Sequence, residues 1–530
     1  MSTQRPSQPS PNPFRFSNGS QNTVSTIERL HRGSMTSSQL QQPPIAASGK
    51  AHKLENNNSP AANNDDSDRE SGRAKEYGFW APELAALRKE YLIGIARLTA
   101  MVTILVWGVL GIYWGGLWTA SSKVHNLTAY IINRDGPTGI IGNTTQNALL
   151  GSMHLKWQVI DPTLYPDAAS IEQAIATDEK AWLAVEVTQD VSSRLSTART
   201  NGDASWNSQD TVIMYYSEAR ANTVIPGMVV SPTLKVLESA FANMTVTLAQ
   251  QYLRSAMTNT TALEAVERAP QTLVTPVIVT AQNLRAWDQT VATAPTFVGL
   301  IYVVILALNV TLGNFGMRQA IQGKLKLSSM IAMRIIIPVI VYLFLSFQYA
   351  MLNLPFKLHF DGWKLGFGAG FLTFVAATWC GMTVLGLIIE CVLAIVGSAF
   401  IGFFLILLII ANVVTVVYPI PMMPAFFRYG YAMPFYHLKN IYVHIVYNTS
   451  KHILVLYHFG ILFAWIAMLL ATFPLWIVLE RRRGIEAQEK AAEEAANNSE
   501  QPNDFSAPPS RQYDREQGDE KVQHTSVGQP

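Results

Sequence analysis

The ionisable side chains inside apolar segments are the residues of this 530-residue chain whose positions could do chemistry. A carboxylate or histidine in the middle of a membrane span can carry a coupling ion. Arg334 and Glu390 fall at the ends of apolar segments, and His458 falls near one end of the last segment. The other polar residues inside the segments are neutral, namely Asn309, Gln348 and Asn412. This placement argues against a proton antiporter.

Motifs of known enzyme chemistry are missing from the sequence. The chain has no G-x-x-x-x-G-K-[ST] phosphate loop and no H-E-x-x-H, G-x-S-x-G or C-x-x-C motif. His125, His154 and the acidic residues between 161 and 179 are scattered. Cys380, inside the fourth apolar segment, and Cys391, at the start of the fifth, are interpreted as small buried hydrophobes. We predict that the protein is not an enzyme and has no catalytic residue, cofactor or metal site, and we keep an active site in 119–295 as the least favoured alternative.

A proline- and aromatic-rich stretch at 418–452 is the strongest candidate for a functional element. Prolines between 419 and 424 prevent a regular helix, and the aromatic side chains that follow fit an interfacial or re-entrant segment. We predict an aromatic cap on the outer face of the membrane domain. Its candidate functional residues are Arg428, Tyr429, Tyr431, Pro434, Phe435 and Tyr436.

Six apolar segments could position these residues, because a bilayer crossing takes roughly 20 apolar residues. They cover residues 98–118, 296–315, 331–352, 365–389, 392–417 and 453–479. The composition agrees, since 49% of the residues are hydrophobic and only 14% are charged. We predict an α-helical polytopic membrane protein with six transmembrane helices, the last five forming a bundle over 296–479.

Basic residues indicate the orientation of the predicted spans. Arginine and lysine cluster at 88–97, 318–334 and 481–483. Six spans place all three clusters on one side of the membrane, so both termini are predicted to be cytoplasmic. The tails at 1–75 and 480–530 are rich in polar residues, and we expect them to be largely disordered, with a juxtamembrane segment at 76–97 that contains a short interfacial helix.

Residues 119–295 lie between the first two spans and are predicted to be an extracytoplasmic α/β domain. Apolar residues alternate at 183–187 as in a half-buried strand, and 211–216 and 277–280 are further β-rich runs. From Leu234 to Tyr252 they recur at steps of three and four, as in an amphipathic helix. The region contains no cysteine, so this domain must be stable without disulfides.

Two further sets of residues follow from short patterns. The N-x-S/T sequons in the segments predicted to be exported give the candidate glycosylation sites Asn126, Asn143, Asn243, Asn259 and Asn448. Small residues spaced four apart give the candidate helix-packing positions Gly111, Gly115, Gly366, Gly370, Ser398 and Gly402. The second set is consistent with a homodimer.

Several strings resemble the fungal nitrosoguanidine-resistance membrane protein family. They are FWAPEL at 79–84, DPTLYP at 161–166, EKAWLAV at 179–185 and, most specific, FRYGYAMPFY at 427–436. The resemblance covers roughly residues 78–483. The order of one span, a large domain and five more spans also resembles the membrane subunit of type-2 ATP-binding-cassette exporters. These resemblances imply resistance to toxic compounds, a plasma-membrane location, a permease-like dimer and either a separate ATPase or another energy source.

Three hypotheses about function follow. The first is export or membrane transport of a small amphipathic toxin or lipid, in contact with the lipid bilayer. The second is a non-transporting regulator or scaffold that affects lipid organisation in the plasma membrane. The third is an enzyme in the exported domain. We predict no nucleic-acid partner.

Overall fold

The computed structural model describes residues 77–257, 260–364 and 366–500. The chain divides into two units, Met1–Ala81 and Pro82–Pro530. The predicted disordered tails lie outside the described residues, apart from the part of 480–530 up to residue 500, which is helical.

Six helical segments in the described part of the chain are long and apolar enough to cross a membrane. They are Pro82–Leu117, Thr290–Arg318, Leu327–Leu352, Gly366–Val396, Ser398–Val417 and His452–Glu493. Their main helices are α1 (Ala85–Ile104), η2 (Leu105–Leu110), α2 (Gly111–Leu117), α9 (Gly299–Arg318), α10 (Leu327–Leu352), α11 (Gly366–Val396), α12 (Ile401–Val417) and α14 (His452–Glu500). The protein is therefore a multi-pass membrane protein whose spans contact the lipid bilayer.

Two predicted boundaries are wrong. The break between the fourth and fifth spans falls at Gly397, whose φ is 79°, so 392–396 belongs to α11 rather than to the next helix. A side chain would strain this conformation, and glycine is the residue that adopts it freely. The predicted boundary between the juxtamembrane segment and the first span, at residue 98, is also wrong. Helix α1 begins at Ala85, directly after η1 (Pro82–Leu84), and continues through residue 98 without interruption.

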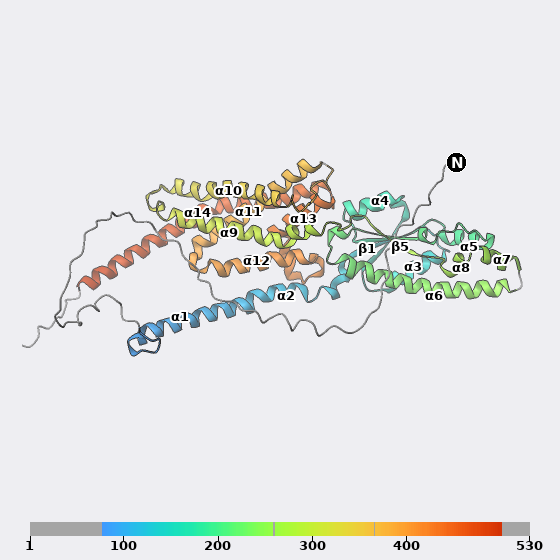
Figure 1. Ribbon diagram of the computed structural model, residues 1–530, viewed down its shortest axis with the longest axis horizontal. Helices are drawn as coiled ribbons and strands as arrows, with labels where there is room; N and C mark the ends of the chain where they lie inside the picture. Colours follow the sequence, from blue (N-terminus) through green and yellow to red (C-terminus); the bar gives the residue numbers. More distant parts are fainter. Residues whose placement is uncertain (1–76, 258–259, 365, 501–530) are drawn as a thin grey trace, which may run out of the picture. The chain divides into compact units, whose positions relative to one another are not determined.

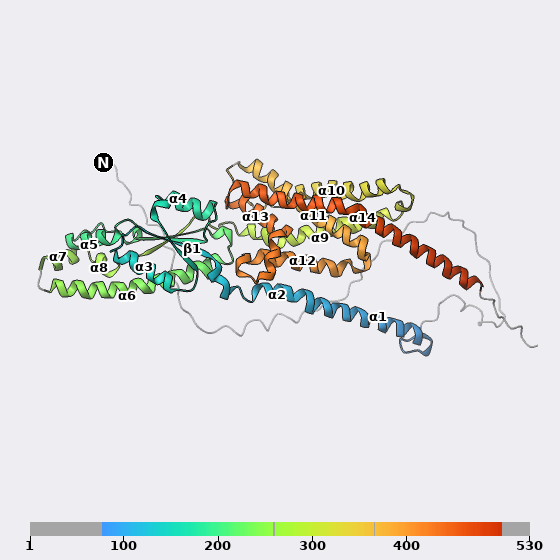
Figure 2. The same cartoon turned by 180° about the vertical axis from the view of Figure 1, so that it is seen from behind.

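Helix α11 is the centre of the bundle, and the first span lies at its margin. Helix α11 packs against α9, α10, α14 and the short helix α13 (Pro434–Tyr447). Of the most apolar 18-residue stretch of α11, 72% is buried. The first span packs against α12 through η2 and α2, and only 6% of its most apolar 18-residue stretch is buried. Figures 1 and 2 show α9, α10, α11, α12 and α14 side by side.

The chain between the first two spans contains a five-stranded sheet with the order β2-β1-β3-β4-β5. Its strands are β1 (Thr128–Asn133), β2 (Lys156–Ile160), β3 (Leu183–Val187), β4 (Val212–Tyr216) and β5 (Val279–Asn283). Within this sheet, only the pair β3 and β4 is antiparallel. Strand β3 is buried along its whole length rather than half-buried as predicted, because it is the central strand and is covered on both faces.

Helices cover the two faces of this sheet. The first face packs against α3 (Ile140–Gly151), α5 (Val191–Asn201) and α6 (Ser231–Ala256), which is the predicted amphipathic helix. The second face packs against α4 (Ala168–Glu172) and η5 (Gln173–Thr177). The short helices α7 (Thr260–Arg268) and α8 (Gln271–Val274) precede β5. We refer to this region as the α/β domain.

The α/β domain contacts one end of the bundle, which we call the domain end; the other is the distal end. The Lys451 ammonium lies 3.0 Å from the Asp178 carboxylate, and the Tyr447 hydroxyl donates to the Gln289 carbonyl at 3.0 Å. The predicted cap forms η13 (Ile420–Met422), η14 (Ala425–Ala432) and α13 at this end. The cap therefore contacts both the spans and the α/β domain.

Candidate functional sites at the two ends of the bundle

Four charged side chains meet at the distal end of the bundle. Arg318 is the last residue of α9, Arg334 lies in the second turn of α10, Glu390 lies near the end of α11 and Glu480 lies on α14. The side chains of Arg318, Arg334 and Glu390 are between 1% and 4% exposed, and that of Glu480 is 30% exposed. We call these four residues the charge cluster. It connects four of the six spans.

The contacts within the charge cluster are uneven. Arg334 and Glu480 form a two-pronged pair, in which the Nη atoms donate to the carboxylate oxygens at 2.6 and 2.9 Å. Glu390 Oε1 lies 2.6 Å from Arg318 Nη1 and 3.2 Å from Arg334 Nε, and neither contact has the geometry of a hydrogen bond. The cluster holds two positive and two negative groups, so its formal charge is balanced.

Hydrogen-bonding capacity remains in the buried half of the charge cluster. Among the described residues, both Glu390 oxygens and all three guanidinium nitrogens of Arg318 lack a hydrogen-bond partner. The amide nitrogen of Asn314, one turn earlier on α9, also lacks one. A buried polar group without a partner costs about 1–3 kcal/mol, and more if it is charged. The cluster is therefore held by charge attraction without a complete set of hydrogen bonds.

A cavity of about 380 Å³ opens beside the charge cluster. Glu480 contributes to its lining, and so do residues of α9, α10 and the later part of α14. Its polar lining side chains are Gln319, Gln322, Glu480, Arg481 and Gln488. Glu480 thus links the cavity to the buried arginines.

The six predicted cap residues have different environments. Tyr431, which is 44% exposed, and the half-buried Tyr436 line a cavity at the domain end, with ring centroids 5.5 Å apart. The other four residues do not line it. Arg428 is exposed, and Pro434 begins α13. The Tyr429 hydroxyl donates to the Ala411 carbonyl at 3.1 Å, and the backbone N–H of the buried Phe435 donates to the Asn412 side-chain oxygen at 3.3 Å. The cap therefore contributes two predicted residues to the cavity.

The cavity at the domain end has a volume of about 180 Å³, and we call it the cap cavity. The α/β domain contributes one wall, and α12 and the cap, including α13, contribute the others. Its lining includes Glu179, Trp182, Arg220, Tyr418, Tyr431, Tyr436 and Lys439. Two cations, one carboxylate and four aromatic rings surround it.

Lys439 of α13 reaches the end of α12. Its ammonium donates to the Val416 carbonyl at 2.6 Å, where the last carbonyls of a helix lack partners in their own helix. No carboxylate lies within ion-pair distance of it in the described ranges. Burial lowers the pKa of Lys439 to about 8. The group is therefore a cation at neutral pH that lacks a formal counter-charge.

Arg220 comes from the α/β domain and is held by several contacts. Its guanidinium lies over the Trp182 ring, 3.7 Å from the centroid. It donates to the Ala181 carbonyl at 2.8 Å and to the Glu179 carbonyl at 3.1 Å, and its Nε lies 3.7 Å from the Glu179 carboxylate. Burial lowers the pKa of Arg220, and the Glu179 charge opposes this shift. Arginine remains charged in proteins.

His437 fixes the position of the Tyr431 backbone. Its Nε2 lies 3.0 Å from the Tyr431 carbonyl, which only accepts, so this nitrogen carries the proton. Its Nδ1 then accepts from Nδ1 of His458 at 2.8 Å. Burial lowers the pKa of His437 to about 4, against a smaller opposite effect of the Tyr431 carbonyl. The contact between His437 and His458 therefore supports the cavity wall.

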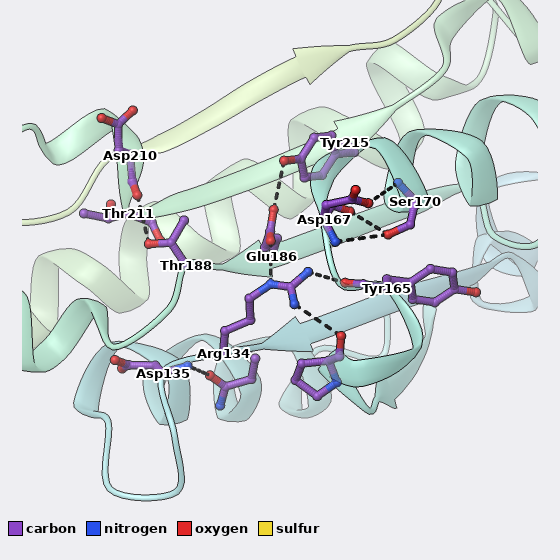
Figure 3. Close-up of polar contacts among 12 residues, drawn as sticks. Arg134, Asp135, Tyr165, Asp167, Ser170, Glu186, Thr188, Asp210, Thr211 and Tyr215 are labelled. Carbon is purple, nitrogen blue, oxygen red and sulfur yellow. Dashed lines mark hydrogen bonds and ion pairs between the residues drawn. The ribbon is translucent and has the colours of Figure 1, made fainter.

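A third polar cluster lies inside the α/β domain (Figure 3). Arg134, after β1, donates to Glu186 of β3 at 2.7 Å, to the Pro162 carbonyl at 3.2 Å and to the Tyr165 carbonyl. The Tyr215 hydroxyl of β4 donates to the other Glu186 oxygen at 2.8 Å. Burial, with a smaller contribution from Glu186, raises the pKa of Tyr215. We call Arg134, Glu186 and Tyr215 the sheet cluster. Its charged groups are paired, which is typical of structural support.

The structure places the candidate glycosylation sites in different surroundings. Asn243 is exposed on α6, Asn143 and Asn448 are half-buried, and Asn259 lies outside the described residues. Asn126 is exposed, but its side-chain nitrogen donates to the Pro421 carbonyl at 3.0 Å. Attachment of a glycan at Asn126 would replace one of the two hydrogens on this nitrogen, at a contact between the α/β domain and the cap. Glycosylation stays a prediction.

The candidate packing positions also differ. A Cβ at Gly370 would lie 1.8 Å from the Phe360 carbonyl oxygen, so this position needs a glycine. A Cβ at Gly115 would make ordinary contact with Phe427, and Gly111, Gly366 and Gly402 have open space. Ser398 is exposed. The role of these positions between two copies of the chain stays a prediction.

Sequence patterns did not single out several functional candidates. Lys439 was visible only as a basic residue near a span, although a lysine within the aromatic- and apolar-rich 434–447 segment was a usable signal. Arg220 and Glu480 had no local signal, because their neighbours in space come from distant parts of the sequence. Arg334 and Glu390 were visible as charges at the ends of spans. Their meeting with Arg318 depends on how three helices are rotated.

Comparisons with known proteins support a membrane protein of unknown activity. A family model with the description "Protein of unknown function (DUF3533)" matches residues 98–471. An uncharacterised endoplasmic reticulum membrane protein of Saccharomyces cerevisiae is 22% identical over 426 residues, which is 75% of this chain and 82% of the yeast protein. No solved structure matches the chain. Since the family model spans most of the chain, including all six membrane helices in whole or in part, the protein belongs to the DUF3533 family.

Proposed function

We propose that this protein transports small amphipathic compounds, among them toxic compounds or lipids, across a fungal membrane. The observation that carries the proposal is the charge cluster at the distal end. Charged residues in membrane spans are costly and usually serve the passage of a substrate or ion. Here they join α9, α10, α11 and α14 beside a polar cavity.

The charge cluster would act as a gate at the distal end. Its contacts hold four spans together, but Arg318 and Glu390 keep unused donors and acceptors. Another partner, such as water or a polar group of the substrate, could satisfy these atoms after the spans separate. The cost of opening is therefore smaller than for a cluster whose hydrogen bonds are complete. Transport would also need an energy source, because the membrane domain has no ion-coupling carboxylate at its centre.

The energy source proposed here is a separate ATPase, because the chain has no phosphate-binding loop. The resemblance to type-2 exporter subunits supports this assignment and a dimeric permease. The resemblance of the 427–436 string supports resistance to nitrosoguanidine and other toxic compounds. We also propose that the protein is not an enzyme, since the sheet cluster is occupied by its own contacts.

We propose that the distal end and both termini face the cytoplasm, so that the α/β domain is extracytoplasmic. The basic residues at 318–334 and 481–483 support this orientation. The resemblance favours the plasma membrane, whereas the yeast relative is described as an endoplasmic reticulum membrane protein. Fluorescence microscopy of a tagged chain, with protease protection of a tag at either terminus, would decide both points.

The test is the retention of a radiolabelled nitrosoguanidine-type compound in cells with and without the protein, before and after ATP depletion. Expression should speed the loss of label, and ATP depletion should abolish this difference. The double variant Arg318→Met/Glu390→Met should lose the effect at equal surface abundance. The matched control Glu186→Gln, in the sheet cluster, should keep it.

A second function remains supported by one observation. The α/β domain is attached to the bundle by the Lys451–Asp178 ion pair and by the Tyr447 and Asn126 hydrogen bonds. Such attachment also suits a non-transporting regulator or scaffold that organises plasma-membrane lipids. Unchanged retention together with preserved resistance would reject transport and favour this function.

A further inference from the structure

The cap cavity combines charge and aromatic surface in a way that a purely structural interface does not need. Its charged residues are Glu179 and Arg220 from the α/β domain and Lys439 from α13. The remaining titratable groups that line it are Tyr418, Tyr431 and Tyr436. With the tyrosines neutral, the formal charge of the lining is +1. An anionic group is the ligand that this charge favours.

The positive charge in the cavity is not neutralised by the protein. Arg220 has Glu179 beside it, with 3.7 Å between the nearest charged atoms. Lys439 has only the Val416 carbonyl, and an ammonium can donate three hydrogen bonds. Two donors of Lys439 are therefore free for a ligand within the part of the chain that the structure describes. Phosphate and carboxylate oxygens accept strong hydrogen bonds from such a group.

The cavity wall is organised before any ligand binds. Two carbonyls and the Trp182 ring hold the Arg220 guanidinium in place. Glu179 has a φ of 52°, which is uncommon for a residue other than glycine, and its carbonyl is one of the acceptors for Arg220. Backbone conformations of this kind concentrate at ligand sites, where neighbouring contacts hold them.

An apolar cavity offers space for the other half of an amphipathic ligand. It has a volume of about 400 Å³ and lies between α11, α12 and α14. Met433 and Pro434 line it, whereas Tyr431 and Tyr436, two residues away on either side, line the cap cavity. One short segment therefore separates a cationic space from an apolar one.

We propose that the cap cavity binds the oxyanion head group of an amphipathic molecule, with Lys439 and Arg220 as its charged ligands and the apolar cavity as the place of its hydrocarbon part. This proposal rests on the proposed transport function, because it names the chemistry of the lipid-like compounds among those transported. The head group is a phosphate or carboxylate. Trp182, Tyr431 and Tyr436 would contact the atoms next to it.

Lys439 also has a structural role as a partner of the last α12 carbonyls, so the test must separate the two roles. Lys439→Gln can still donate to the Val416 carbonyl but carries no charge. Lys439→Arg keeps the charge. The matched control is Lys364→Gln, an exposed lysine just before α11 at the same end of the bundle.

The experiment measures equilibrium binding of radiolabelled dodecyl phosphate to the purified full-length chain in neutral detergent. We expect Lys439→Gln to weaken binding by about tenfold or more, as for the loss of a charge-assisted hydrogen bond. Lys439→Arg and Lys364→Gln should stay within about threefold of the wild type. Arg220→Lys, which keeps the charge and loses the planar fork, should weaken binding by an intermediate factor.

Three competitors identify the source of the anion. Unlabelled dodecyl phosphate should compete, while dodecyl phosphocholine and inorganic phosphate should compete much more weakly. Equal competition by inorganic phosphate would replace the amphipathic ligand with a free anion and overturn the proposal. Equal binding by wild type and Lys439→Gln would overturn it as well. The binding measurement involves no transport, so the two proposals can fail separately. Either the protein binds the head group without speeding the loss of label from cells, or it speeds that loss without binding the head group.

Discussion

A buried glutamate contacts a buried arginine in two regions of the molecule, the sheet cluster and the charge cluster. In the sheet cluster, Glu186 accepts from Arg134 and Tyr215, and the remaining Arg134 donors reach two carbonyls (Figure 3). In the charge cluster, Glu390 and Arg318 attract each other without aligned hydrogen bonds. Completed contacts favour one arrangement of a region. Incomplete contacts leave an alternative arrangement closer in free energy.

The largest effect is expected from Glu390→Gln. The change leaves Arg318 buried without its acidic partner, while Arg334 keeps Glu480. Removal of one partner from a buried pair costs about 3–5 kcal/mol of folding free energy. Thermal unfolding of the purified protein in detergent measures the loss. A stability equal to that of the wild type would show that the charge cluster carries no net charge attraction.

The paired change Arg318→Met/Glu390→Met sharpens the same test. It removes both charges, and replacing a buried ion pair by apolar residues is often neutral or stabilising. We expect most of the stability lost in Glu390→Gln to return. If the double variant is less stable than the single one, the two side chains would not act as a pair.

Glu186→Gln is expected to have a smaller effect, about 1–3 kcal/mol in the unfolding of the α/β domain. The side-chain amide that this change introduces keeps one acceptor oxygen, while a full charge opposite Arg134 is lost. Limited proteolysis at increasing temperature would follow the domain. Transport should not change, and a loss of transport at normal abundance would contradict the structural role of the sheet cluster.

The pH dependence of head-group binding tests Lys439, a cation with one hydrogen bond, to the Val416 carbonyl. Because burial lowers the pKa of Lys439 to about 8, the ammonium is mostly protonated at pH 7 and mostly neutral at pH 9. Binding of dodecyl phosphate should therefore weaken by up to about tenfold as pH rises across this range. Lys439→Arg should show a much flatter profile. A steep loss of binding in that variant would assign the titration to another group.

Tyr215→Phe should have the smallest effect, about 1 kcal/mol or somewhat more. The change removes the hydrogen bond to one Glu186 oxygen and leaves Arg134 in contact with the other. Thermal unfolding of this variant beside Glu186→Gln separates the contributions of the hydroxyl and of the charge. A larger loss for Tyr215→Phe would reverse the order of importance within the sheet cluster.

The number and the approximate positions of the spans could be predicted from hydropathy, because each crossing needs a long apolar segment whatever its neighbours are. The break at Gly397 could not be placed, since the sequence stays apolar on both sides of it and only the backbone turn reveals the end of α11. In the sheet, β3 to β5 were visible as β-rich runs, though displaced for β5. Strands β1 and β2 were missed. Every residue of β2 is exposed or half-buried, so this strand has no buried face that a sequence pattern could reveal.

The candidate sites were less predictable than the spans. Tyr431 and Tyr436 were found because aromatic residues after prolines are conspicuous in a sequence. Their neighbours Arg220 and Lys439 are more than 200 positions apart in the chain and meet only because the α/β domain lies on the cap. Similarly, Glu480 reaches Arg334 from another helix. Such meetings depend on tertiary packing and leave no periodic signal.

The strand order has a consequence for how the protein is made. Four strands of the sheet have been synthesised once the ribosome reaches Tyr216. The fifth strand of the sheet comes after α6 and the two short helices that follow, and it ends at Asn283. The next membrane span begins at Thr290. The ribosome therefore completes the sheet and starts the second span almost together. Closure of the sheet thus depends on a strand that is made only just before that span.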